Sequence, residues 1–452
     1  VLSYYNESLD EGYYFEDASG NKYTAETATA LIKSEPSSFE VHYKDGENIA
    51  DIGNVESSIS SAIERGENHT YPVTSTITVK YGENSFTVDN TPVYYDGTSK
   101  NYYYYKWSDT NGDMITVVEF ADRFANYTGK VDVYHQYAEG KEPLAVGTVE
   151  RIFENGTIRY TDGQFVPVGN FRTDIQNAEL EVNTGASEEC VLKYYNETIG
   201  EGYYFTNADN SGDTKKYTAE EVSELAKSGP VNFNAYYAVA GKDQPVSIGA
   251  VVSTVKASVA YDNTTDKYTV TATVTLKSPD NSIDITEEVG VYDASTGKGY
   301  YFEFTDDKGT KSTQEQLNNR FEGFTGKAEI YYQCEDGKTV VKAGEVERIL
   351  ESTELTYENE VFVPKGTFHT EVRSLDGSQS LETIYTSTSE NDVLSYYDKA
   401  LDEGYYFEDA SGNKYTAENA TAFIKSEPSS FEVHYKDGEN IIDIGNVESS
   451  IS

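Results

Sequence analysis

Residues 393–452 repeat residues 1–60 with only six substitutions, and this internal copy constrains the fold more than any other feature of the chain. A stretch that recurs so closely must form the same folded unit in both places, which is the behaviour of a repeat protein. We therefore predict a tandem array of modules, of which this chain is an excerpt. An array supplies length, reach or self-association, whereas a single active site would not need the copy.

A tyrosine-rich signature marks where each repeat begins. The pattern Tyr-Tyr…Gly-Tyr-Tyr-Phe starts at Tyr4, Tyr194 and Tyr396. Weaker relatives of it start at Tyr94 and Tyr292, and these two stretches share a later Val-Glu-Arg-Ile motif. The chain therefore alternates two types of module, which we name A and B.

The order of the types is A-B-A-B followed by a partial A. We define module A1 as residues 1–92, B1 as 93–190, A2 as 191–290, B2 as 291–392 and A3, the partial copy, as 393–452. Each full module has about 100 residues, a normal size for a domain. We predict that each module has its own hydrophobic core and that short junctions limit bending, so that the array is elongated.

Within each module the residues predict several strands and one short helix. A threonine precedes each predicted helix, at Thr24, Thr116, Thr218, Thr313 and Thr416. A threonine hydroxyl there caps the helix by accepting a hydrogen bond from an unpaired backbone N–H of the first turn. Residues 268–277 alternate apolar side chains with threonines, the period of a strand with one buried face. The predicted fold class is strand-rich α+β, built from ββαββ units plus further strands. This order resembles a β-grasp arrangement, in which one helix lies across a mixed sheet.

The charge balance restricts the partners of the chain. It carries 78 acidic and 35 basic side chains, a formal net charge of −43. Such a field repels phosphate backbones and anionic lipid surfaces, so we predict no binding to nucleic acid. No stretch approaches the 18 or more apolar residues of a membrane span, so we predict no membrane insertion in this segment. Two cysteines are present; Cys334 is predicted to be a buried free thiol, and a Cys190–Cys334 disulfide is the alternative.

Two acidic turns are candidate metal sites: Asp109, Asn111 and Asp113 in B1, and Asp209, Ser211 and Asp213 in A2. Oxygen ligands at the first, third and fifth positions resemble the start of an EF-hand loop, although the turn glycine falls at the fourth position instead of the sixth. We predict that these turns could hold Ca²⁺ and stiffen the chain, and we predict no other cofactor. The alternative is a plain turn ahead of a capped helix.

The densest aromatic patch comprises Tyr102, Tyr103, Tyr104, Tyr105 and Trp107. Successive side chains of a strand point to opposite faces, so part of the patch should face the core and part should face outward. Outward rings can stack on sugars, which makes these residues candidates for glycan binding. The alternative is that the rings serve the core and the contacts between modules.

Catalytic patterns are absent from the sequence. It has no Ser/His/Asp spacing, no nucleophile elbow, no glycine-rich phosphate loop and no His/Cys metal cluster. We predict that the protein is not an enzyme.

Near-exact tandem modules, acidity, more Lys than Arg and few Cys, Met and Trp residues resemble the repeat region of a bacterial or archaeal extracellular surface protein, such as an adhesin stalk or a fibre-forming protein. The resemblance implies an extracellular or cell-surface location. We predict a structural repeat protein that forms a filament or surface stalk, with neighbouring copies of itself as partners. The alternative is an adhesin that binds host or cell-surface glycans through exposed tyrosines and is stiffened by Ca²⁺.

Overall fold

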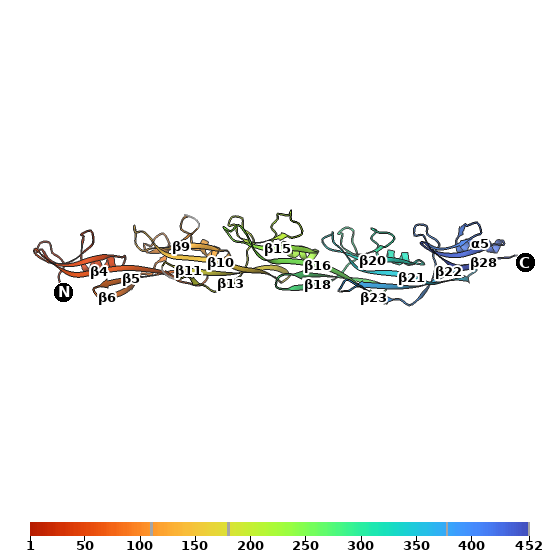
Figure 1. The fold of residues 1–452 in the computed structure, drawn as a ribbon, viewed down its shortest axis with the longest axis horizontal. Coiled ribbons are helices and arrows are strands. Elements are labelled where there is room, and N and C mark those ends of the chain that lie inside the picture. The colour runs from red at the N-terminus through yellow and green to blue at the C-terminus, as the bar shows by residue number, and fades with distance from the viewer. Residues whose placement is uncertain (109–111, 179–180, 377, 451–452) are drawn as a thin grey trace. The chain divides into compact units, whose positions relative to one another are not determined.

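The computed structural model describes residues 1–108, 112–178, 181–376 and 378–450 (Figure 1). The chain forms two compact units. One comprises Val1–Thr206, Lys215–Ala219 and Asn234–Gly249, and the other comprises Asn207–Thr214, Glu220–Phe233 and Ala250–Ser452. Strands dominate both, and short helices of eight to ten residues accompany them. The predicted strand-rich α+β class is therefore confirmed.

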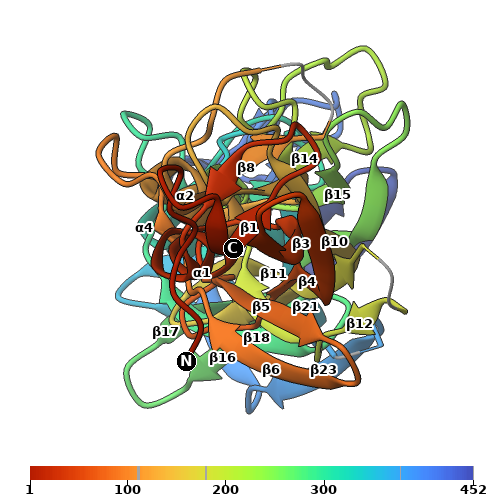
Figure 2. The same ribbon diagram turned by 90° about the vertical axis from the view of Figure 1, so that its left-hand side faces the viewer.

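Module A1 folds as one antiparallel sheet. In chain order, its helix follows the second strand and precedes the third. The sheet order is β2-β1-β3-β4-β5-β6, and Figure 2 shows helix α1 beside β1 in the view from that end of the chain. The elements are β1 (Glu11–Glu16), β2 (Lys22–Tyr23), α1 (Ala25–Ile32), β3 (Ser38–Asp45), β4 (Asn48–Ile63), β5 (Val73–Tyr81) and β6 (Asn84–Asp89). Ala28 and Ile32 of the helix pack with Phe39 and Ile77 of the sheet in a buried cluster.

Module B1 repeats this plan with longer strands. Its sheet order is β12-β11-β10-β9-β8-β7, and β13 also pairs with β11. The elements are β7 (Val93–Tyr94), β8 (Tyr102–Trp107), α2 (Val117–Asn126), β9 (Gly129–Gln136), β10 (Leu144–Thr161), β11 (Gln164–Asn177), β12 (Asn183–Thr184) and β13 (Glu188–Val191). Phe120 and Phe124 of α2 are fully buried, which fixes the helix against the sheet.

Module A2 contains β14 (Gly202–Asn207), α3 (Ala219–Ser228), β15 (Val231–Ala238), β16 (Val246–Asp262), β17 (Lys267–Lys277) and β18 (Ser282–Val289). β17 pairs antiparallel with β16 on one side and β18 on the other. Its side chains alternate between buried and half-buried from Tyr268 to Leu276, and the lysine at each end is exposed, so the period-2 prediction for this strand is confirmed.

Modules B2 and A3 complete the series. B2 has the sheet order β19-β20-β21-β22-β23, with β24 pairing β22, and A3 has the order β26-β25-β27-β28. The elements of B2 are β19 (Gly299–Phe304), α4 (Gln314–Phe321), β20 (Gly326–Gln333), β21 (Val340–Glu358), β22 (Val361–Leu375), β23 (Leu381–Thr386) and β24 (Glu390–Val393). Those of A3 are β25 (Glu403–Glu408), β26 (Lys414–Tyr415), α5 (Ala417–Ser426), β27 (Ser430–Asp437) and β28 (Asn440–Glu448).

The predicted threonine caps lie where the helices begin. Thr24, Thr116, Thr313 and Thr416 each accept a hydrogen bond from the backbone N–H three residues later. Helix α3 begins one residue after Thr218. These caps place every helix at the same step of the repeat, between the first strands of a module and the strand that follows.

The β-grasp-like arrangement is not confirmed. A β-grasp sheet is mixed, whereas the pairs of named strands in A1 and A3 are antiparallel. Parallel pairing within the described residues is confined to the segment ahead of the first long strand, at the two-residue pair β7–β8 of B1 and at single bridges such as Tyr4–Tyr13 and Tyr396–Tyr405. The helix returns the chain to the sheet beside the first strand but in the opposite direction. Each sheet therefore continues as an antiparallel meander.

Three hydrophobic clusters cross the predicted module boundaries, contrary to the expectation of a separate core for every module, although A1 also has a cluster of its own. The cluster between A1 and B1 combines Ile63 and Tyr71 with Phe120, and the cluster between A2 and B2 combines Tyr268 with Phe302. A third cluster joins B2 to A3. Long strands produce this sharing: the first half of a strand such as β4 pairs with β3, and its second half pairs with β5 and reaches the next module. The junctions are therefore part of the folded core.

Candidate functional site: the module junctions

A buried carboxylate holds the junction between B1 and A2. Glu201, directly before the first strand of A2, has none of its surface exposed. The Thr128 backbone N–H donates to its Oε1 at 2.7 Å, and the Thr128 hydroxyl donates to its Oε2 at 2.9 Å. Arg123 Nη2 lies 3.2 Å from Oε2, and the Tyr237 hydroxyl donates to Oε1 at 2.7 Å. Both carboxylate oxygens thus receive two hydrogen bonds, which offsets the cost of removing the charge from water.

The same arrangement recurs between B2 and A3. Glu403 is 3% exposed, and it accepts from the Thr325 N–H at 2.5 Å and from the Thr325 hydroxyl at 2.7 Å. Arg320 Nη1 lies 3.5 Å from its Oε2, and the Tyr435 hydroxyl donates to its Oε1. We call each set of four residues a carboxylate clamp. Burial and the adjacent carboxylate raise the pKa of the Tyr435 phenol, so it stays a hydrogen-bond donor.

A leucine fills an apolar recess beside each clamp. Leu192 and Leu394 are 3% and 2% exposed. A side-chain carbon added at Gly169 would lie 2.7 Å from both Leu192 and Phe153. At Gly366 an added carbon would lie 2.7 Å from both Leu394 and Phe368. The recess therefore exists because these two positions of the B modules carry no side chain.

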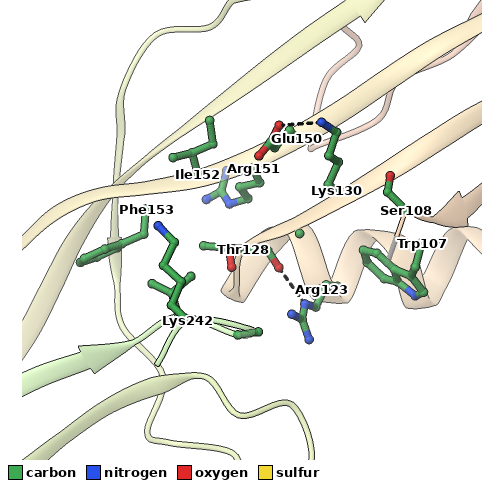
Figure 3. Close-up of a pocket in the computed structure, with 13 residues that line it drawn as sticks. Trp107, Ser108, Arg123, Thr128, Lys130, Glu150, Arg151, Ile152, Phe153 and Lys242 are labelled. Carbon is green, nitrogen blue, oxygen red and sulfur yellow. Dashed lines mark hydrogen bonds and ion pairs between the residues drawn. The ribbon is translucent and has the colours of Figure 1, made fainter. Parts of the chain in front are cut away.

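A cleft lies next to the B1–A2 clamp. It has a volume of about 490 Å³, and Figure 3 shows Trp107 at one end and Phe153 at the other. The cations that line it are Arg123, Lys130, Arg151 and Lys242, against one acid, Glu150. Lys130 Nζ lies 3.3 Å from Glu150 Oε2, within ion-pair distance. Arg123 and Arg151 also pair with acids, Glu201 and Glu188, so Lys242 is the lining cation without an ion pair among the described residues. The cleft thus combines one such cation with an aromatic wall.

One cation of the cleft is unusual. Arg151 is 1% exposed, its guanidinium lies 4.7 Å from the centre of the Phe171 ring, and its Nη1 lies 3.3 Å from Glu188. Its Nε has no hydrogen-bond partner in the described part of the chain. Arg348, its counterpart in B2, has the same unpartnered Nε, so this feature is common to both B modules.

The A1–B1 junction uses different residues at the same repeat positions. Asn101 and His135 stand where the A modules carry the clamp glutamate and tyrosine. His135 Nε2 lies 2.7 Å from Asn101 Oδ1, and its Nδ1 lies 2.8 Å from the hydroxyl oxygen of Ser61 in A1. Burial lowers the pKa of His135 to about 4, so the ring is neutral near pH 7. It therefore makes its hydrogen bonds to Asn101 and Ser61 as an uncharged group.

The Ser61–His135 contact has the reach of a nucleophile–base pair. A base with such a low pKa is weak at neutral pH. At the A2–B2 junction the corresponding residues are Ala257 and Tyr332, both buried in a core cluster. Replacement by apolar and phenolic side chains in the second copy favours a structural role for the pair.

The predicted acidic turns are described only in part. Asp109 and Asn111 lie outside the described residues, and Asp113 is exposed. Asp209 and Ser211 are exposed and Asp213 is half-buried, and the Asp209 carboxylate accepts a hydrogen bond from Asn232 at 3.2 Å. Within the described residues, no group of three or more His, Cys, Asp or Glu side chains is arranged to hold a metal ion. Ca²⁺ binding at these turns stays a prediction.

The aromatic patch divides between the core and the cleft. Tyr104 and Tyr105 are buried, and Tyr105 donates to the Tyr71 carbonyl at 2.6 Å and stacks on Phe120. Tyr102, Tyr103 and Trp107 are half-buried. Of the five candidates, Trp107 lines the cleft.

Both cysteines are free thiols in the structure. Cys334 is buried as predicted, and burial raises its pKa to about 11. Cys190 is half-buried in β13, opposite Gly169.

The clamp residues were not among the predicted sites. The sequence did contain a signal for these residues. Glu201 and Glu403 occupy the same aligned position of the A modules, where the B modules carry Asn101 and Lys298 instead. Comparing the two types position by position would have separated clamp residues from general acidity. What no such comparison could supply is the partner, since Thr128 and Arg123 lie more than 70 residues away in the chain.

Comparison of the chain with models of protein families, with curated proteins and with solved structures found no match. Among the described helices, none has both the length and the apolar character needed to span a membrane.

Proposed function

We propose that the protein is a structural extracellular repeat protein that forms a filament or surface stalk from tandem modules. The observation that supports this most is the repeated carboxylate clamp, in which a charge with four hydrogen bonds is buried between two modules at Glu201 and again at Glu403. A catalytic or binding protein does not need its inter-module contacts repeated in this form.

The physical basis of the proposal is resistance of the junctions to bending and separation. Opening a clamp would expose the apolar leucine recess and would leave the carboxylate and its donors to be rehydrated. Exposure of the apolar recess costs free energy, and so does loss of the four hydrogen bonds, which hydration of the separated groups offsets only in part. The two changes must occur together because both features share one interface. Modules joined in this way form a stiff array.

Electron microscopy of purified chains tests the proposal. We expect elongated particles for the 452-residue chain, and a second chain with the 392-residue A-B-A-B superunit duplicated should be longer by the length of that superunit. Particles that stay compact after the duplication would contradict a filament or stalk. Small-angle scattering gives the same length in solution.

A second candidate function is that of an adhesin repeat that binds glycans, and the cleft of B1, lined by Trp107 and Lys242, favours it. An aromatic wall at Trp107 can stack on a sugar ring, and Arg151 and Lys242 can pair with its carboxylate or sulfate groups. The ligand class is therefore an acidic glycan.

Acidic and neutral glycans on an array distinguish this candidate from the first. We expect retention of acidic glycans that is lost in a Trp107→Ala variant and reduced in Lys242→Ala. Lys338→Ala, at an exposed lysine of B2, serves as the control. Absence of binding to any acidic glycan would remove the adhesin candidate and leave the structural one.

A further inference from the structure

Cys190 of module B1 stands at a position where module B2 carries an aspartate. Cys190 lies opposite Gly169 in the pairing of β13 with β11, and Asp392 lies opposite Gly366 in the corresponding pairing of β24 with β22. The two modules therefore place a thiol and a carboxylate at the same point of the same strand pair. The chain thus contains its own comparison of the two side chains in one setting.

The neighbour of this position is a buried arginine in both modules. Each guanidinium packs against a phenylalanine ring, with its carbon 4.6 Å from the ring centre in B2 and 4.7 Å in B1. Arg348 Nη2 of B2 pairs with the Asp392 carboxylate. In B1 the same atom of the arginine, Arg151 Nη2, donates to Cys190 Sγ at 3.5 Å.

Arg151 therefore lacks the carboxylate that its counterpart has at Nη2. Its Nη1 lies 3.3 Å from Glu188, but that side chain is 51% exposed, and water and salt weaken an exposed pair. Its Nε, like that of Arg348, has no hydrogen-bond partner among the described residues. Since a buried charge is stabilised by an opposite charge beside it, the position of Cys190 favours a negatively charged group.

We propose that Cys190 is an oxidation site: hydrogen peroxide converts its thiol to a sulfinate, which then pairs with Arg151. A sulfinate carries two oxygens and a negative charge on the atom after Cβ, as an aspartate carboxylate does. The product therefore reproduces in B1 the ion pair that B2 forms with an aspartate. The inference goes beyond the proposed function and does not depend on whether the array is a stalk or an adhesin.

The oxidation runs in two balanced steps. First, the Cys190 sulfur attacks one peroxide oxygen, the O–O bond breaks, and a sulfenic acid and one water form. The sulfenic sulfur then attacks an oxygen of a second peroxide molecule, which gives the sulfinic acid and another water. The acid proton passes to solvent. In each step sulfur is oxidised and peroxide oxygen is reduced.

Burial directs the reaction to Cys190 and away from the other cysteine. Cys190 is half-buried, so peroxide reaches it. Cys334 is 1% exposed, and burial raises its pKa to about 11; such a thiol is inert. Cys334 is for the same reason unsuited to trap the sulfenic acid as a disulfide, so oxidation of Cys190 continues to the sulfinate.

The new ion pair would hold β13 more firmly to the sheet of B1. β13 pairs with β11 through residues 188–191, and Leu192, directly after it, is buried in the recess of the B1–A2 junction. A charged hydrogen bond at Cys190 therefore strengthens the segment through which B1 continues into A2.

Peroxide treatment of the folded full chain tests the proposal. By peptide mapping we expect two added oxygens on Cys190, apart from the sulfoxide that peroxide forms at the exposed Met114. Cys334 should react at least about tenfold more slowly. Hydrogen exchange of residues 188–191 should slow by at least about fivefold after the treatment.

Substitutions at the two matched positions provide the controls. Cys190→Asp should show the slow exchange without peroxide, and Cys190→Ser should show no change with it. Asp392→Cys moves the thiol into B2, where exchange of residues 390–393 should become faster and should slow again after peroxide treatment. If Asp392→Cys fails to fold, Cys190→Asp still decides the question.

Three results would overturn the proposal. They are equal oxidation rates of the two cysteines, a disulfide-linked dimer in place of the sulfinate, and exchange of residues 188–191 that stays unchanged both in Cys190→Asp and after oxidation. The length of single chains in micrographs is independent of all three, so this inference and the structural proposal fail separately.

Discussion

At the scale of single residues, the most consequential groups are ionisable side chains buried at junctions. A carboxylate without hydrogen bonds would be strongly destabilised inside a protein. Glu201 is tolerated because Thr128, Arg123 and Tyr237 surround it. The same dependence makes each member of the clamp sensitive to substitution.

The repeats provide a matched pair for testing the clamp. We expect Glu201→Gln to reduce the stability of the B1–A2 junction by about 2–3 kcal/mol, since one oxygen acceptor becomes a donor that faces other donors. Glu11→Gln, at the same repeat position but exposed, should cost less than about 0.5 kcal/mol. Native-state hydrogen exchange measures the two effects, at residues 128–136 for Glu201→Gln and at residues 38–45 for Glu11→Gln, and equal effects of the two substitutions would contradict the clamp.

His135 gives a pH dependence of known sign. Its pKa is about 4 in the folded protein because of burial, against about 6.5 in an unfolded chain. The unfolded state therefore binds more protons between these values, and stability that is present above about pH 6.5 is lost as the pH falls towards 4.

We expect roughly 3 kcal/mol of junction stability to depend on this group. Urea unfolding at a series of pH values, compared with a His135→Gln variant, isolates its contribution from that of the many carboxylates. If the wild-type and variant curves keep a constant separation between pH 4 and 7, His135 is not the titrating group.

At the scale of elements, the tyrosine signature is held together by a glycine in a conformation that other residues rarely adopt. Gly202 has a φ of +129°, and a side-chain carbon there would lie 2.7 Å from the Tyr194 carbonyl oxygen. The signature glycines Gly12, Gly299 and Gly404 have positive φ as well. The close approach lets the chain ahead of the strand pair with it, as in the Tyr194–Tyr203 bridge.

Gly202→Ala should therefore destabilise the start of A2 by about 1–3 kcal/mol from backbone strain alone. Gly212→Ala is the control, because that position has ordinary φ and an added carbon would meet only Asn210 at 3.5 Å. Thermal unfolding of the two variants measures the difference. A Gly202 variant as stable as the control would show that the backbone can relax there.

At the scale of the whole molecule, sharing of core clusters couples neighbouring modules. Phe368 and Leu394, which belong to different modules, lie in one cluster. Loss of one module exposes apolar surface of the next, so the free energy of unfolding contains a large interface contribution in addition to that of each module.

Leu394→Ala should cost about 2–5 kcal/mol, the range for a buried leucine truncated to alanine, and should lower the stability of both B2 and A3. Leu2→Ala, at the exposed counterpart, should be nearly neutral. Single-molecule stretching of the array reports the two modules separately. Weakening of A3 alone, with B2 unchanged, would contradict a shared core.

Local patterns account for what could be predicted. Threonine caps located helices, and period-2 alternation located strands such as β17, because both signals depend on neighbours in the chain. The antiparallel strand order and the clamps were not predicted, since they depend on contacts such as Thr325 with Glu403, 78 positions apart.

The sequence by itself determined the repeat, its two alternating types, the strand-rich class and the start of each helix, because these follow from composition and short-range spacing. Only the tertiary structure decided that successive modules share cores, that a glutamate among 78 acidic side chains becomes a buried clamp, and that glycines of one module make room for a leucine of the next. The reason is physical: the energy of a buried charge or an apolar recess depends on which distant groups surround it, and that is settled only when the chain has folded.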